Sequence, residues 1–285
     1  RVMQSVESPS VKASIKSIIN NKPILLMTLS QILGSFAVGG SKQDYYIDVL
    51  NFASLGLITG IPGAIINPFS YMAVPWFRRH FSSRFLYIIG NKIDGILLVP
   101  VFLVGCIGGK KHGLYKNIWV MGIAMMLWET IFMIFYGVRR IIPTEMYNEA
   151  MDYCEWKNGY RTEGMTSVAQ GLASKLASIF SRYISNYIKQ LIGYDLTRYV
   201  RGTAQTDETK FGLFAMFTIV PFLTGMISII PMLFYDLSGK KKEKMYEELL
   251  ERRAAMSKEA TSGDLEALER LAKAQMEIGN MKQEL

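Results

Sequence analysis

Long apolar runs separated by short polar turns dominate residues 23–237, and several of the runs exceed 20 residues. A run of that length is enough for a helix to cross the roughly 30 Å hydrocarbon core of a bilayer. The pattern predicts six membrane-spanning helices, over residues 23–50, 53–77, 85–108, 115–140, 163–193 and 211–236. The sequence therefore predicts an all-α membrane protein, with a polar cytoplasmic linker at 1–22 and a soluble, amphipathic cytoplasmic tail at 238–285.

Basic residues gather in the turns that would face one side of the membrane. They lie in the linker, at 78–84, at 139–161 and at 240–244, whereas the intervening turns hold fewer. Because cytoplasmic loops carry an excess of Lys and Arg, both ends of the chain are expected on the cytoplasmic side. The expected location is the plasma or inner membrane, as a multi-pass protein.

Composition narrows the function classes. Half of the residues are hydrophobic, and the net charge of +8 resides mostly in the loops and the tail, so nucleic-acid binding is not expected. The two Cys and two His are scattered, which predicts no metal site, no other cofactor and no disulfide framework. No catalytic triad or phosphate loop is recognisable, so we expect no catalytic residues and no enzyme.

The predicted helix at 163–193 has an unusual polar face. About 31 residues at roughly 1.5 Å each would extend about 46 Å. Small and basic residues share one face of this helix, and large apolar residues share the other. Lys175 would lie about 18 Å from the helix start, near mid-membrane. A charge at that depth is costly, so Lys175 is expected to face water or a carboxylate; the alternative is that its long side chain extends to the membrane surface.

A charged run at 152–164 leads into this helix and reads Asp152-Tyr153-Cys154-Glu155-Trp156-Lys157-Asn158-Gly159-Tyr160-Arg161-Thr162-Glu163-Gly164. The run resembles the cytoplasmic-loop signature of the glycoside-pentoside-hexuronide cation symporters, whose pattern is roughly D-Y-x-E-W-K-x-G-x-R-x-E-G. That family is the melibiose-carrier branch of the major facilitator superfamily. The resemblance implies that the chain is the C-terminal six-helix half of such a carrier.

The resemblance also implies where substrate binds. Gln170 and Lys175 coincide with a glutamine and a lysine that the family carries in the same helix, near its sugar and cation sites. Arg140 falls where relatives place a sugar-contacting aromatic, so it departs from the family pattern. Together with Arg182 it favours an anionic substrate such as a uronide, since a guanidinium offers paired donors to a carboxylate, although a neutral glycoside stays open. The candidate substrate-binding residues are Lys175, Gln170, Gly171, Ser174, Arg140 and Arg182.

Two further sets of charged residues are candidates for coupling and gating. Glu129 and Asp94 lie inside predicted spans, where each can titrate a proton or pair with Lys92 or Arg182; with Lys175 they form the coupling set. The charged run supplies a cytoplasmic gate whose ion pairs form in one state and break in another, with static pairing at helix ends as the alternative. The gate candidates are Asp152, Glu155, Lys157, Arg161 and Glu163.

The predicted function is secondary transport of a sugar or glycoside, coupled to Na⁺ or H⁺ by alternating access. The resemblance assigns the main cation-binding carboxylates to the N-terminal half, which this chain is expected to lack, and Lys175 is expected to pair with them. The expected partners are that N-terminal half, the lipid bilayer and a small-molecule sugar. An uncoupled facilitator, or a carrier of a non-sugar amphiphile such as a lysolipid, is the alternative.

Overall fold

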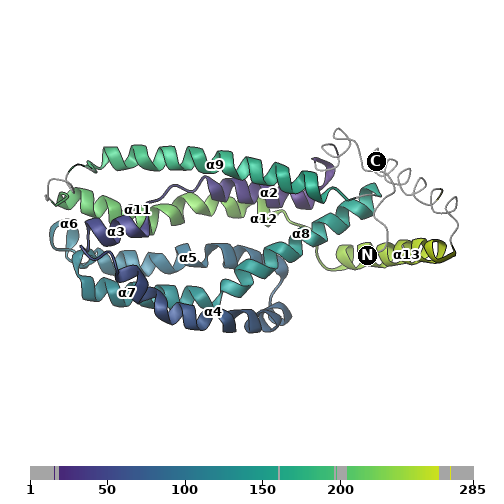
Figure 1. The fold of residues 1–285 in the computed structure, drawn as a ribbon, viewed down its shortest axis with the longest axis horizontal. Coiled ribbons are helices and arrows are strands. Elements are labelled where there is room, and N and C mark those ends of the chain that lie inside the picture. Colours follow the sequence, from purple (N-terminus) through teal and green to yellow (C-terminus); the bar gives the residue numbers. More distant parts are fainter. Residues whose placement is uncertain are drawn as a thin grey trace. The chain divides into compact units, whose positions relative to one another are not determined.

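A computed structural model describes residues 16, 19–159, 161–195, 197, 204–262 and 270. Within this part of the chain all regular structure is helical (Figure 1). The helices are α2 (Lys22–Ser35), α3 (Lys42–Asp48), α4 (Leu55–His80), α5 (Ser83–Gly105), α6 (Gly109–His112), η1 (Leu114–Lys116), α7 (Ile118–Ile134), α8 (Tyr136–Asn158), α9 (Glu163–Leu191), α11 (Asp207–Gly225), η2 (Met226–Ser228), α12 (Ile229–Leu233) and α13 (Lys240–Ser262).

Four helical stretches in the described residues are long and apolar enough to cross a membrane: Leu55–His80, Ser83–Gly105, Ile118–Asn158 and Asp207–Leu233. They correspond to the second, third, fourth and sixth predicted spans, so the prediction of an all-α membrane protein is confirmed. The count of six is not confirmed. α2 has only 14 residues, and α9, although it is one continuous helix of 29 residues as predicted, has a markedly polar face.

The first predicted span is not one helix, which corrects the expectation of a continuous rod over 23–50. α2 ends at Ser35 and α3 begins at Lys42, so residues 36–41 interrupt it. Gly39 and Gly40 lie in this interruption. A Cβ at Gly39 would meet Pro221 at 2.6 Å, and one at Gly40 would meet Met216 at 3.1 Å. A side chain at Gly39 would therefore overlap Pro221, and one at Gly40 would require Met216 to move by a few tenths of an ångström, because α11 approaches the interrupted backbone closely.

The charged run is also more helical than predicted. Residues 139–161 were expected to form a loop, but α8 continues through this region to Asn158. Pro143 lies inside the helix without ending it. The helix ends where Gly159 adopts a φ of 78°, the left-handed conformation that commonly terminates helices. Asp152 and Glu155 are therefore fixed on the last turns of α8, whereas Glu163 begins α9.

The chain forms two compact units. Unit 1 comprises Arg1–Ser30, Thr144–Ala173 and Pro231–Leu285, and unit 2 comprises Gln31–Pro143 and Ser174–Ile230. In unit 2, α4 runs along α7 (Figure 1) and α5 contacts α11. Its core is rich in stacked aromatic rings, with Tyr45, Tyr115 and Phe214 fully buried together.

Unit 1 contains the beginning of the tail. α13 buries Met245 and Leu249, four residues apart on one face of the helix, as expected for a helix that rests on a neighbour. Its basic and acidic side chains contact the end of α8, as described below. The first part of the predicted soluble tail is therefore anchored. The sequence also predicts a final helix with Leu265, Leu268 and Leu271 on one side and Ser262 or Asp264 as its cap. Ser262 is the last residue of α13, and the other four residues lie outside the described part of the chain.

Candidate substrate and coupling site

An ion pair in unit 2 joins the beginning of α3 to the middle of α7. Lys42 Nζ lies 3.1 Å from Glu129 Oε2. Thr59 of α4 donates its hydroxyl to the same oxygen at 3.4 Å, and the Tyr46 hydroxyl lies 3.4 Å from the Thr59 hydroxyl. Glu129 lies about 16 Å along α7 from its start, so the pair belongs to the interior of a membrane-spanning helix. Three helices thus meet at one carboxylate.

Aromatic rings surround the ammonium group of this pair. Lys42 Nζ lies 5.8 Å from the centroid of the Tyr46 ring and 5.7 Å from that of Trp128. Rings at this distance attract a cation through their electron-rich faces. The Trp128 indole is held in turn by donation to the backbone carbonyl of Asp94 at 3.0 Å. The site therefore offers Lys42 both a counter-ion and two aromatic neighbours.

The pairing of the intramembrane acids differs from the prediction. Lys92 and Arg182 were considered as partners for Glu129 and Asp94, but Glu129 binds Lys42, and Asp94 lies 3.5 Å from Arg139. Lys92 donates to the backbone carbonyl of Gly225 at 2.6 Å. That carbonyl lies where α11 gives way to the 3-10 turn η2, and such transitions leave carbonyls without their usual helical partner.

Small polar residues satisfy the interrupted backbone between α2 and α3. Ser181 of α9 donates to the carbonyl of Ala37 at 2.7 Å, and Ser185 accepts from the Gly39 N–H at 3.2 Å. Thr224 of α11 exchanges hydrogen bonds with both backbone groups of Val38. Because unsatisfied backbone groups are costly inside a membrane, these contacts permit an interrupted helix there. Broken helices of this kind often mark binding regions in transporters.

The predicted residues of α9 divide between the two units. In unit 2, Lys175 and Arg182 are exposed, and neither has a hydrogen bond or ion pair with another residue that the structure describes. Ser174 has a buried hydroxyl without a partner in the same described part. In unit 1, Gln170 donates to the Thr28 hydroxyl at 2.6 Å. Gly171 is half-buried, with no atom within 4 Å of where its Cβ would be.

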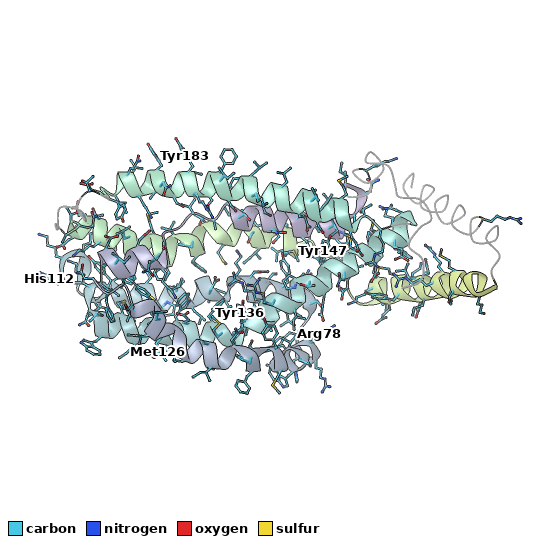
Figure 2. The ribbon with its side chains drawn as sticks, in the orientation of Figure 1. Arg78, His112, Met126, Tyr136, Tyr147 and Tyr183 are labelled. Atoms are coloured by element: carbon cyan, nitrogen blue, oxygen red, sulfur yellow. The ribbon has the colours of Figure 1, made fainter. Side chains whose placement is uncertain are left out.

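The apolar face of α9 is exposed as well. Tyr183 points outward from α9 in Figure 2, and its side chain is 75% exposed. The face that contacts other elements is instead the one with Ser181 and Ser185, both buried. The prediction grouped Ser185 with the basic residues, but within unit 2 Ser185 is buried while Lys175 and Arg182 are exposed.

Arg140 of α8 stays beside a tyrosine of its own helix. Its guanidinium donates to the Tyr136 hydroxyl at 3.0 and 3.1 Å and lies 5.2 Å from the centre of that ring. Tyr136, labelled in Figure 2, also meets the Tyr71 ring edge-on. The Arg140 side chain is exposed. An arginine held over an aromatic ring is suitably oriented to receive an acidic group.

The predicted gate residues form an ion-pair network in unit 1. Arg161 contacts Asp152 at 2.8 Å, Glu155 at 3.6 Å and Glu163 at 2.6 Å. Lys157 does not join these pairs and donates to the backbone carbonyl of Asn20 at 3.2 Å. Four of the five predicted gate residues are therefore brought together around a single guanidinium.

The tail contributes a second arginine that sequence reasoning missed. Arg253 of α13 contacts Asp152 at 2.8 Å and binds Glu155 through two nitrogens, at 2.6 and 3.1 Å. These contacts, led by the hydrogen bonds to Glu155, raise the pKa of the Arg253 guanidinium. Burial, followed by the charges of Asp152 and Glu149, raises the pKa of Tyr246 to about 12, so its hydroxyl stays protonated and donates to Asp152 at 3.3 Å.

A pocket lined by residues with polar side chains lies at the far end of α9 in unit 2. It has a volume of about 460 Å³, and Lys189 forms an ion pair there with Asp44 of α3. Tyr194 donates its hydroxyl to Asp48 at 2.8 Å nearby. The pocket is lined by Asp44, Asn186, Lys189, Gln190, Tyr194 and Asp195.

Comparison with known proteins decides the family. The model of the MFS/sugar transport protein family matches residues 3–239. The chain belongs to this family. The resemblance drawn from the charged run to the glycoside-pentoside-hexuronide symporters of the major facilitator superfamily is thereby confirmed.

Curated relatives of the family are transporters. The chain is 23% identical to a glucuronide carrier protein homolog of Escherichia coli K12 over 255 residues, which cover 87% of the chain and 51% of that protein. It is 25% identical to a putative sulfoquinovose importer of the same strain over 260 residues, 86% of the chain and 49% of the importer. It is 23% identical to an isoprimeverose transporter of Lactiplantibacillus pentosus over 256 residues, 89% of the chain and 50% of that transporter. The chain spans about half the length of each of these relatives, and all of them are carriers rather than enzymes.

Proposed function

We propose that the chain is the C-terminal half of a carrier that moves a sugar or glycoside across the plasma or inner membrane together with Na⁺ or H⁺. Two observations together carry the proposal. The family model matches residues 3–239, and the chain aligns with only about half the length of each transporter relative. In such carriers two halves surround one site near the middle of the membrane and rock about it. The other half, the sugar and the bilayer are the partners that this arrangement requires.

The proposed orientation places both ends of the chain in the cytoplasm. It rests on the basic residues in the last turn of α4, among them Arg78 and Arg79, and on those that begin α13. Under this orientation the ion-pair network of unit 1 is the cytoplasmic gate. The pairs around Arg161 and Arg253 then hold one conformation, and their rupture accompanies the change to the other.

Lys175 is proposed to couple the two halves. Its exposed ammonium group has no partner among the described residues, as expected for a group whose carboxylate lies in the other half. When the cation is absent, Lys175 pairs with that carboxylate, and when Na⁺ or H⁺ neutralises the carboxylate, Lys175 is released. Binding of the cation thereby changes the relative energies of the conformations, which is the requirement for coupling.

An anionic sugar is the proposed substrate class. Two relatives are named for glucuronide and sulfoquinovose, and both sugars carry an acidic group. The exposed guanidinium groups of Arg140 and Arg182 can receive such a group. A neutral glycoside is the second candidate, because another relative is named for isoprimeverose.

The test uses the full-length carrier reconstituted in lipid vesicles. Labelled glucuronate and a neutral methyl glucoside are offered with a Na⁺ gradient, with a proton gradient and with neither. Gradient-driven accumulation of either sugar that is lost in Lys175→Ala, and kept in the exposed-lysine control Lys244→Ala, supports the proposal. Uptake that is unchanged without either gradient indicates an uncoupled facilitator. Competition by lysolipids but not by sugars would show that the substrate class is wrong.

A further inference from the structure

The two partners of the Lys42–Glu129 pair differ in accessibility. The Glu129 side chain is only 13% exposed, whereas the Lys42 side chain is 32% exposed. Glu129 lies against α4, where its Oε1 would be 3.4 Å from a Cβ on Gly60. A solute that approaches unit 2 therefore reaches the ammonium group before the carboxylate.

Lys42 is the sole positively charged partner of Glu129 in the described residues. From α3 the carboxylate faces Lys42 and the uncharged hydroxyl of Tyr46, and from α4 it faces Thr59. On α5, Asp94 pairs with Arg139 and offers its backbone carbonyl to Trp128. The negative charge of Glu129 is thus neutralised by one side chain, which is itself partly open.

This arrangement links the occupancy of Lys42 to the protonation of Glu129. If another anion binds the ammonium group, Glu129 keeps only a neutral hydroxyl at 3.4 Å. A buried carboxylate without a counter-ion is strongly disfavoured inside a membrane, so it binds a proton instead. Conversely, a protonated Glu129 no longer competes for Lys42, which is then free to bind an acidic group of a ligand.

We propose that Lys42 and Glu129 form an exchange site in which the acidic group of the sugar replaces Glu129 on Lys42 while Glu129 takes up one proton from water. The inference rests on the proposed transport function and deepens it by naming the coupling ion and the residue pair at which the acidic group of the sugar is exchanged. Before exchange the site holds one ammonium and one carboxylate, and its net charge is zero. After exchange it holds the ammonium, the anionic group of the sugar and a neutral carboxylic acid, so one proton accompanies each anion and the net charge is again zero.

The principal experiment measures proton uptake directly. Purified full-length carrier in weakly buffered detergent solution is mixed with glucuronate, and a pH indicator dye reports the protons that are bound. The parent protein is expected to take up about one proton per glucuronate, and Glu129→Gln none, although it still binds glucuronate. Binding without proton uptake in the parent, or equal uptake in parent and Glu129→Gln, overturns the exchange.

Transport variants separate recognition from coupling. Glu129→Gln imitates the protonated acid, so it should keep glucuronate exchange between vesicles and medium but lose at least ten-fold of the accumulation driven by a proton gradient. Lys42→Gln should lose at least ten-fold of glucuronate exchange, and Lys42→Arg, which keeps the charge, should restore it. Lys116→Gln breaks another ion pair of unit 2, with Asp207 at 2.6 Å, and is the control that should change neither activity.

The outcomes distinguish this inference from the proposed function. If the parent accumulates sugar with Na⁺ alone, or exchanges methyl glucoside but not glucuronate, the exchange site is refuted while sugar transport stands. If the parent moves no sugar, both proposals fail. Folding of each variant is checked by its thermal unfolding in detergent. A variant that unfolds is replaced by Glu129→Asp, in which proton uptake with glucuronate should persist; its loss there would contradict the inference.

Discussion

Removing the Arg253 side chain should loosen the attachment of α13 to α8. Arg253 makes three charge-assisted contacts in unit 1: one with Asp152 at 2.8 Å and two with Glu155 at 2.6 and 3.1 Å. Arg253→Ala removes all of them. Arg253→Lys keeps the charge but cannot bind Glu155 through two nitrogens, so its effect should be smaller.

The size of the effect depends on the contacts that Asp152 and Glu155 keep when the Arg253 side chain is removed. Breaking a fully buried pair costs about 3–5 kcal/mol, and losing an exposed pair costs about 0–1 kcal/mol. Asp152 and Glu155 are 15% and 22% exposed, but Arg253 is 37% exposed, and Arg161 still contacts both acids in its absence. We therefore expect a loss of about 1–2 kcal/mol, between these limits, in the free energy that holds α13 in place.

Amide hydrogen exchange along α13 measures this free energy. Since about 1.4 kcal/mol corresponds to a factor of ten, exchange in α13 should accelerate about 5- to 30-fold in Arg253→Ala. Lys244→Ala is the matched control, because Lys244 is exposed and lies 4.0 Å from its own-helix partner Glu248. Exchange in Arg253→Ala within two-fold of the parent protein would refute the reasoning, and so would equal acceleration in the control.

Three further predictions concern packing, the interrupted helix and pH. Gly137→Ala should lower the stability of the protein by about 1–3 kcal/mol in thermal unfolding, because the added Cβ would lie 2.6 Å from the backbone oxygen of Ser70. Gly122→Ala is the control and should not lower the stability, because its Cβ would make one ordinary contact at 3.6 Å. Ser181→Ala should cost about 1 kcal/mol in the same assay, since it leaves the partly buried carbonyl of Ala37 without its 2.7 Å donor. No change would show that the interruption does not need this bond. Burial favours a higher pKa for the Asp236 carboxyl, but hydrogen bonds from two lysines outweigh it and lower the pKa. The stabilisation is therefore present above the unfolded pKa of about 3.9 and is lost as the pH falls through the lower folded value, so the difference in unfolding temperature between the parent and Asp236→Asn should shrink below about pH 4.

The sequence predicts helices well here because a membrane demands long apolar runs. The extents of α4, α5 and α9 agree with their predicted ranges within a few residues. The interruption after Ser35 was missed because the apolar run over 23–50 is long enough to be interpreted as one continuous helix. Its hydrogen-bond donors, Ser181 and Thr224, lie more than 140 residues away, and no local pattern identifies such partners.

Partners of charged residues were harder to predict than the residues themselves. Glu129 was selected because it is an acid inside an apolar run, but Lys42 was overlooked because it begins a short polar stretch beside aromatic residues. Arg253 was overlooked because a charged tail is ordinarily solvated. The spacing of Met245 and Leu249 was a signal that one face of that tail is buried.

The polar residues of α9 serve two purposes that the sequence does not separate. An unbroken helix over 23–50 would satisfy its own backbone and would need no serine from a neighbour. Because residues 36–41 leave the helical path, Ser181 and Ser185 supply the hydrogen bonds that this backbone lacks, and they turn inward in unit 2. At about 100° per residue, Arg182 is rotated about 100° from Ser181 and about 60° from Ser185, and Lys175 is rotated about 120° and about 80° from them, so both basic side chains leave the helix beside the serine face. Lys175 and Arg182 are left exposed for this geometric reason, which makes them available to a substrate or to a second half of the carrier.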